Sequence, residues 1–334
     1  MTVKSVRENR LEWIDWMKAI GIYLIILGHF YSVGEKWIYV FHVPLFFVIS
    51  GFLTSKESDC RKFWQKLWYN LVVPMLIMAS MSFVYACVIQ QLHGTFELKT
   101  FYWFFRNVLF GMVAGFDNLW FVYTLILLKI ICQFFTSRKW LLALTMVMMI
   151  LACAYNHADM SAMPFFLINP NCIINVCLAM PFMAFGVMAR DYKVQLDDWN
   201  NKVLLIIATF VGGLMVSLCG HYNSLVGLHS CSYGDNLLLF LLGALAGTMM
   251  AYAICKLLGH SPKIITIISR GTIVILAFHK IIIGWWRDFF PASSLDVFAA
   301  AVILLLFVPI VRIAESYFPL MVGKYRVNRL KNML

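Results

Sequence analysis

The chain has 334 residues, of which 62% are hydrophobic and only 13% are charged, and its mean hydropathy is +0.81. A soluble domain is about 25% charged, so this composition excludes an ordinary water-soluble protein and favours a bundle of membrane-spanning helices. The formal net charge of +11 is explained by basic loops facing anionic lipid, and no soluble basic face points to nucleic acid.

Ten apolar segments have lengths near the roughly 20 residues that cross a hydrocarbon core. In chain order they are 14–33, 37–54, 66–90, 118–135, 140–155, 171–189, 202–219, 235–258, 264–286 and 296–314. The aromatic stretch 100–114 is interpreted as an interfacial or re-entrant segment. We therefore predict one all-α polytopic membrane domain over residues 1–334, with a short N-terminus (1–13), about ten transmembrane helices and a C-terminal tail (315–334).

The distribution of basic residues predicts the orientation of this bundle. If the N-terminus is cytoplasmic, 18 lysine and arginine residues lie inside, 4 lie outside, and the remainder of the 27 fall within the predicted helices. Cytoplasmic loops of membrane proteins are enriched in lysine and arginine. We therefore expect both termini to be cytoplasmic.

The nine cysteines lie mostly inside apolar segments, and the sequence contains no Cys-x-x-Cys pair. Cysteines in such positions usually act as small buried hydrophobic residues. We therefore expect neither a metal site nor a bound cofactor.

The first segment, IDWMKAIGIYLIILGH, carries three ionisable residues, Asp15, Lys18 and His29. At about 100° per residue all three share one helix face, with Lys18 and His29 about 16 Å apart along the axis. Ionisable side chains cost about 2.5–3.5 kcal/mol at mid-bilayer, so such a face should line the bundle interior or a wet cavity. Asp15 and Lys18 lie near the inner interface, and a lysine there can also extend its charge to water.

The second segment, FHVPLFFVISGFL, returns antiparallel to the first after a short turn. His42 falls at a depth similar to that of His29. It can be interpreted either as a functional residue or as a histidine at the membrane interface. Ser50 and Gly51 form a small face that permits close helix approach.

These two segments together resemble the opening helices of the acyltransferase-3 family, bacterial inner-membrane proteins that acylate, mostly acetylate, hydroxyls of surface glycans. Further along, RKFWQKLWYNLVVP, NLWF and ISRGTIVILAFHK resemble the family's basic loop and third helix, a middle helix start and a late helix. Lys18 stands where many members have arginine, which makes the chain most similar to the fucose 4-O-acetylase-like subgroup.

The resemblance implies an O-acyltransferase of the bacterial inner membrane that uses acetyl-CoA as co-substrate and a glycan or lipid-linked saccharide as acceptor. Its general base would be His29, because an imidazole titrates near neutral pH. Lys18 would orient the thioester donor or its phosphates, Asp15 would hold Lys18, and His42 is a second candidate for base or acceptor contact. The other implied contacts are Ser50, Asn118, Trp120 and His279 for the acceptor, and Lys56, Arg61, Lys62 and Lys66 for the donor phosphates.

Two other functions remain open on the sequence. A transporter or exporter of a glycan or small molecule would also bury charges in its helices, although transporters often show two repeated halves and no internal repeat is visible here. A catalytically inactive relative acting as a structural partner would have no need of His29. The oligomeric state does not follow from the sequence.

Overall fold

The computed structural model describes residues 10–110, 119–135, 137–157 and 171–323. Every regular element in these ranges is a helix, which confirms the all-α prediction for the described part of the chain. The helices are α2 (Glu12–Gly28), α3 (Glu35–Phe52), α4 (Cys60–Leu67), η1 (Trp68–Val72), α5 (Val73–Leu92), α6 (Lys99–Phe110), α7 (Leu119–Phe134), α8 (Arg138–His157), α9 (Asn171–Ala189), η3 (Arg190–Tyr192), α10 (Lys193–Asp198), α11 (Lys202–Tyr222), η4 (Leu228–Ser230), α12 (Leu237–Leu258), α13 (Lys263–Arg270), α14 (Thr272–Phe289) and α15 (Asp296–Tyr317).

Each of the ten predicted segments coincides with one of these helices or with up to three consecutive ones. Among the described residues, six helical stretches are long and apolar enough to cross a membrane, and α13 with α14 makes a seventh if that bent pair is one span. This pattern is that of a multi-pass membrane protein. The number of ten spans and the cytoplasmic location of the termini stay predictions.

The predicted segment 264–286 is not one straight helix. It is divided into α13 and α14, which meet at an angle of 84° on either side of Gly271. A Cβ atom at Gly271 would lie 2.2 Å from a methyl carbon of Val311, so glycine is required for α15 to pass this close to the break. Both α13 and α14 contact α2, which brings the N-terminus of α14 into the centre of the protein.

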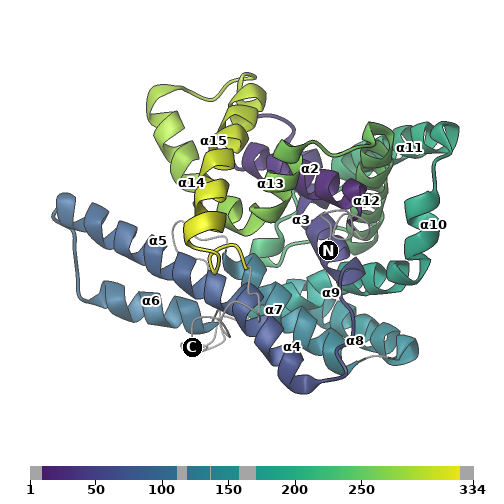
Figure 1. Cartoon of the computed structure of the whole chain (residues 1–334), viewed down its shortest axis with the longest axis horizontal. Helices are drawn as coiled ribbons and strands as arrows, with labels where there is room; N and C mark the ends of the chain where they lie inside the picture. The colour runs from purple at the N-terminus through teal and green to yellow at the C-terminus, as the bar shows by residue number, and fades with distance from the viewer. Residues whose placement is uncertain (1–9, 111–118, 136, 158–170, 324–334) are drawn as a thin grey trace, which may run out of the picture.

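Helix α3 lies in the middle of the bundle, where it contacts α2, α9 and α12 (Figure 1). It crosses α9 with the two backbones in contact. A Cβ atom at Gly51 would lie 2.2 Å from the carbonyl oxygen of Met183, and one at Gly186 would lie 2.1 Å from that of Val48. The prediction that Gly51 permits close helix approach is therefore confirmed.

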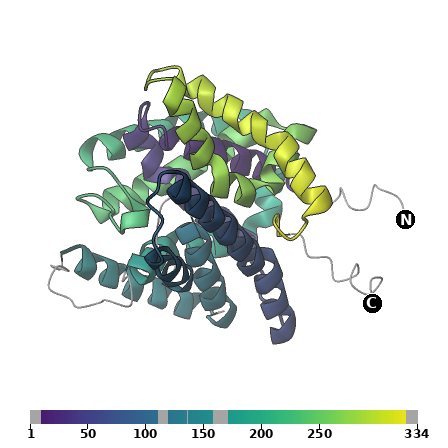
Figure 2. The same ribbon diagram turned by 90° about the vertical axis from the view of Figure 1, so that its left-hand side faces the viewer.

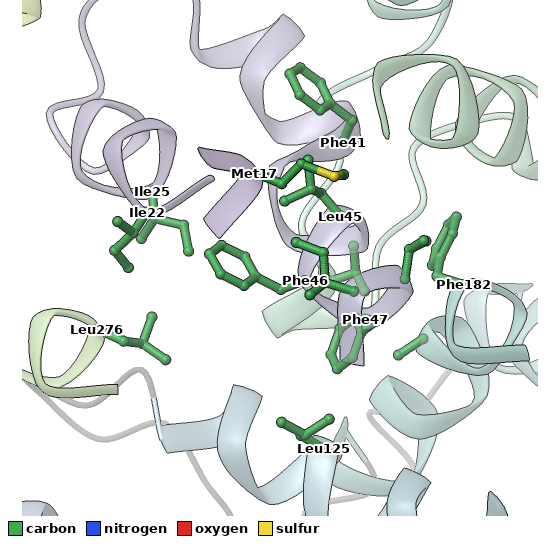
Figure 3. Packing of buried hydrophobic residues seen from close by; sticks show 14 of the residues in the cluster. Met17, Ile22, Ile25, Phe41, Leu45, Phe46, Phe47, Leu125, Phe182 and Leu276 are labelled. Carbon is green, nitrogen blue, oxygen red and sulfur yellow. The ribbon is translucent and has the colours of Figure 1, made fainter. Parts of the chain in front are cut away.

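Aromatic and aliphatic side chains fill the space around α3. Figure 3 shows Phe47 of α3 pointing toward Leu125 of α7, and Phe46 pointing to the other side of α3 from Phe182 of α9. Phe47 and Phe182 are fully buried. Because lipid tails are as apolar as these side chains, close packing rather than exclusion of water holds the helices together here.

Helices α5 and α6 form an antiparallel hairpin that projects from the bundle (Figure 1). The rings of Phe83 and Phe104 stack between the two helices, with centroids 4.3 Å apart. Figure 2, viewed from this side, shows α14 and α15 above the hairpin. Residues 100–110 of the predicted interfacial stretch thus form a helix beside α5, whereas residues 111–114 lie outside the described residues.

Candidate active site

His29 is the residue that ends α2, and its side chain lines a cavity. Its Nδ1 atom lies 2.7 Å from the carbonyl oxygen of Ile25, one turn earlier in the same helix. A carbonyl oxygen only accepts hydrogen bonds, so Nδ1 carries the ring proton and Nε2 keeps its lone pair. His29 is therefore held as the tautomer whose Nε2 can accept a proton.

His279 of α14 packs directly against His29, although 250 residues separate them in the chain. Its side chain is fully buried, and the two ring centroids are 4.9 Å apart. Its Nδ1 atom donates to the carbonyl oxygen of Ile275 at 2.9 Å, which leaves Nε2 as an acceptor 3.3 Å from Nδ1 of His29. The Nδ1–H of His29 thus faces two acceptors, and both would stabilise the imidazolium that forms when Nε2 takes up a proton.

His42 of α3 lies on the same cavity and is held in the same way. Its side chain is buried, its Nδ1 atom lies 2.7 Å from the carbonyl oxygen of Ile38, and the ring of Tyr39 is 4.9 Å away. The carbonyl again fixes the proton on Nδ1 and leaves Nε2 as an acceptor. His29 and His42 thus present the same tautomer from two different helices.

The cavity that these histidines share has about 640 Å³ of empty space including its open mouth, and we call it the His29 cavity. It is lined by Ile25, His29, Tyr31, Tyr39, His42, Val43, Trp120, Phe121, Leu228, His229, Leu276 and Lys280. Its wall combines aromatic rings, which can stack on a sugar, with hydroxyl and imidazole groups, which can orient one. Partial burial, and then the Lys280 ammonium, hold the pKa of the His229 imidazole, in the loop helix η4, below its usual range.

A buried ion pair fixes the turn that follows His29. Both terminal nitrogens of Arg287 bond the carboxylate of Asp296, at 3.0 and 2.7 Å, and one also donates to the carbonyl oxygen of Phe30 at 2.9 Å. The carboxylate of Asp296 is buried. Tyr31, the next residue, has a left-handed backbone with φ of 52°, which is uncommon for a tyrosine. The Arg287–Asp296 pair therefore holds a strained turn that places His29 and Tyr31 at the cavity.

At the other end of α2, Asp15 and Lys18 line a second and larger cavity of about 1250 Å³ including its open mouth, which we call the Lys18 cavity. Among the described residues, Asp15 and Lys18 form no direct ion pair, although the two charges interact electrostatically. Asp15 instead pairs with Arg10 at 2.5 Å and accepts a hydrogen bond from the hydroxyl of Ser269 at 2.6 Å. The hydrogen bond that Arg10 donates to Asp15 is also the main reason why the pKa of the Arg10 guanidinium is raised. The polar face predicted for the first helix is confirmed, and it serves two cavities.

The other predicted site residues are divided between these cavities and the surface. Trp120 lines the His29 cavity, as the acceptor prediction requires, and His279 supports that cavity from behind. Ser50 is half-buried on α3 and lines neither of the two cavities. Asn118 lies outside the described residues. Four predicted donor contacts are absent from both cavity walls and lie in α4 or just before it: Lys56, Arg61, Lys62 and Lys66.

Several residues of the site were missed in the sequence. Tyr31, Tyr39, His229 and Lys280 line the His29 cavity, and Arg10 pairs with Asp15. A signal existed for Lys280, because it directly follows His279 in an otherwise apolar segment. Within the described ranges, no group of three or more His, Cys, Asp or Glu side chains could hold a metal ion.

Comparison with known proteins agrees with the family resemblance found in the sequence. The model of one family, described as an acyltransferase domain, matches residues 11–313. A nodulation protein NolL of Sinorhizobium fredii is 25% identical over 277 residues, which cover 73% of this chain and 68% of the relative. A nodulation protein NolL of Mesorhizobium japonicum is 26% identical over 264 residues, covering 73% and 67%. No solved structure matches the chain.

Proposed function

The chain belongs to the acyltransferase-3 family and is a membrane acyltransferase, and from this premise we propose that it transfers an acetyl group from acetyl-CoA to a hydroxyl of a glycan. The acceptor is a cell-surface or exported glycan or a lipid-linked saccharide, and the protein works in the bacterial inner membrane. The observation that carries this proposal is the His29–His279 pair on the wall of a cavity.

The tautomer of His29 supports its role as the general base. Nε2 of His29 takes the proton of the acceptor hydroxyl while the hydroxyl oxygen attacks the carbonyl carbon of the thioester. The carbon–sulfur bond then breaks, and the coenzyme A thiolate leaves with the proton that His29 held. The products are an acetyl ester, a free thiol and neutral His29. His42, held as the same tautomer, orients the acceptor hydroxyl or serves as a second base.

The two cavities fit a donor and an acceptor that arrive from opposite sides. With the N-terminus in the cytoplasm, the Lys18 cavity opens toward the cytosol, where acetyl-CoA is made. The His29 cavity then lies toward the outer leaflet, where a glycan can stack on Trp120 or bond to Tyr31. For the thioester to meet the acceptor hydroxyl at His29, the donor has to extend about 16 Å along the inner face of α2 from Lys18.

The break between α13 and α14 keeps one alternative open, because broken membrane helices with buried charges are typical of transporters. A transporter or exporter would move a glycan across the membrane without consuming acetyl-CoA. An assay of thiol release separates the two functions.

The test uses purified protein in detergent or nanodiscs with acetyl-CoA and a set of candidate glycans. The proposal predicts glycan-dependent release of free thiol, and the same glycan gains the mass of an acetyl group. Replacing the exposed His221 by alanine serves as the control for loss of a histidine, and that variant should keep its activity. Glycan transport by the protein into vesicles without thiol release would refute the transferase function.

A further inference from the structure

The break at Gly271 exposes the start of a long helix to the Lys18 cavity. Thr272 and Ile273, the first two residues of the 18-residue α14, line this cavity. The N–H groups of a first helical turn have no partner within their own helix, and the helix dipole adds about half a positive charge at this end. Half-helices in membrane proteins direct such N-termini at anionic groups of their substrates. The break therefore places an anion-binding element on the cavity wall.

Four cationic side chains surround this helix start. Arg10, Lys18, Lys193 and Arg270 line the cavity, together with one carboxylate, that of Asp15. Arg10 is paired with Asp15, and Arg270 is paired with Glu315 at 2.8 Å. Two positive charges of the cavity wall are thus neutralised by carboxylates, and the ammonium groups of the two lysines are the excess.

Lys18 is the more informative of these two lysines. Its side chain is half-buried, and among the described residues it makes neither a hydrogen bond nor an ion pair. A lysine inside a membrane protein costs about 2.5–3.5 kcal/mol and normally faces a partner or a ligand site. An ammonium on the wall of a cavity beside a helix N-terminus is what an anionic ligand requires, and the neighbouring carboxylate of Asp15 is already paired with Arg10. Lys193 is exposed at the start of α10, on the rim of the same cavity.

We propose that the Lys18 cavity binds phosphate groups of the acyl donor, through Lys18, Lys193 and the N-terminus of α14. This inference rests on the proposed function, because that function supplies coenzyme A as the ligand. Of the two places that the resemblance implies for the donor phosphates, it favours Lys18 over the loop of Lys56, Arg61, Lys62 and Lys66. Of those four, Lys66 pairs with Glu57 and Lys62 lies 3.8 Å from Asp59.

A phosphate ester could also come from an anionic lipid headgroup, since the cavity is open and the protein lies in a membrane. The two sources have the same chemistry, but they predict different effects of the acyl donor and of the membrane lipid on the kinetics. Donor phosphates make the Michaelis constant depend on which acyl donor is offered. Lipid phosphates make the activity depend on the lipid composition of the nanodisc.

The decisive experiment measures the KM of two donors, acetyl-CoA and acetylpantetheine, which lacks the nucleotide and its phosphates. Lys193→Gln should raise the KM for acetyl-CoA roughly three- to tenfold, because an exposed charge contact is worth about 1 kcal/mol. It should leave the KM for acetylpantetheine unchanged. Lys202→Gln removes another exposed lysine, from the start of α11 outside the cavity, and should change neither value.

Three results would overturn the proposal. A KM for acetyl-CoA that Lys193→Gln leaves unchanged means that no donor phosphate reaches this residue. An equal rise for both donors means that the effect is not on the phosphates. A rise that occurs only in nanodiscs containing phosphatidylglycerol, and not in those of phosphatidylcholine, means that lipid occupies the cavity.

A binding measurement separates this proposal from the function on which it rests. His29→Ala, which should keep only residual turnover, is titrated with coenzyme A by calorimetry, with and without Lys193→Gln. Binding that is weakened by Lys193→Gln supports the phosphate site even if no glycan proves to be an acceptor. Absence of coenzyme A binding to the His29→Ala protein and to the wild-type protein would overturn the phosphate site, whatever other donor the enzyme uses.

Discussion

Replacing His279 by leucine tests the mechanism at its most specific point. The change removes the acceptor that lies 3.3 Å from Nδ1 of His29 and leaves the carbonyl of Ile25 as the remaining partner. A hydrogen bond to a charged group is worth about 1.5–3 kcal/mol, and each 1.36 kcal/mol is tenfold in rate. Because 3.3 Å is a long contact, the low end applies, and kcat should fall roughly tenfold.

The assay is glycan-dependent thiol release by purified protein, with kcat and the KM for acetyl-CoA measured separately. The KM should stay constant, because His279 lies outside the Lys18 cavity. His279→Gln keeps an amide oxygen that can accept the bond and should recover part of the lost rate. Phe278→Leu changes the preceding residue of α14 and controls for packing alone.

A double variant shows whether the two histidines act as one unit. If His279 works through His29, adding His279→Leu to His29→Ala should cost no further activity. An unchanged kcat in His279→Leu, or a full further loss in the double variant, would refute the coupling between the two rings.

Three further predictions follow from the packing and the charges. Gly51→Ala should lower the melting temperature in detergent, because overpacking costs about 1–3 kcal/mol of unfolding free energy. Gly284→Ala adds a methyl group in open space and should leave the melting temperature unchanged. Equal effects of the two changes would contradict the α3–α9 contact. Arg287→Lys keeps the charge but loses the fork that reaches the carbonyl of Phe30, so kcat should fall with the KM for acetyl-CoA unchanged, and a normal kcat would mean that the turn holds itself. Because the pKa of His229 is lowered by folding, stability should decline as pH falls below its unfolded value of about 6.5; His229→Gln should reduce the loss of melting temperature between pH 7 and pH 5, and an unaltered loss would contradict the burial of this ring.

The sequence predicted the features that depend on local periodicity. Asp15, Lys18 and His29 share a face because a helix advances about 100° per residue, and that face does line cavities. The apolar segments coincide with helices because their length and hydropathy follow from the membrane itself. The small face at Gly51 was visible because close helix approach requires the absence of a side chain.

Features that depend on distant parts of the chain could not be predicted in this way. The partner of Asp15 within the bundle is Ser269, 254 residues away, and nothing in the local pattern indicates this contact. An i,i+3 pairing with Lys18 is a local expectation, and the tertiary structure overrides it with Arg10. Glycine is required at the break because Val311 of α15, 40 residues further along the chain, occupies the space that a side chain would need. His229 reaches the site through a loop, which has no helical periodicity to reveal it.

The central claim is that His29 removes the proton from an acceptor hydroxyl. Its most direct test is mass spectrometry of the surface glycan from cells that express either the wild-type protein or His29→Ala as their sole copy, at equal protein levels in the membrane. The account predicts that the acetyl ester present with the wild-type protein is lost with His29→Ala and retained with His221→Ala. Full acetylation of the glycan by the His29→Ala protein would contradict it.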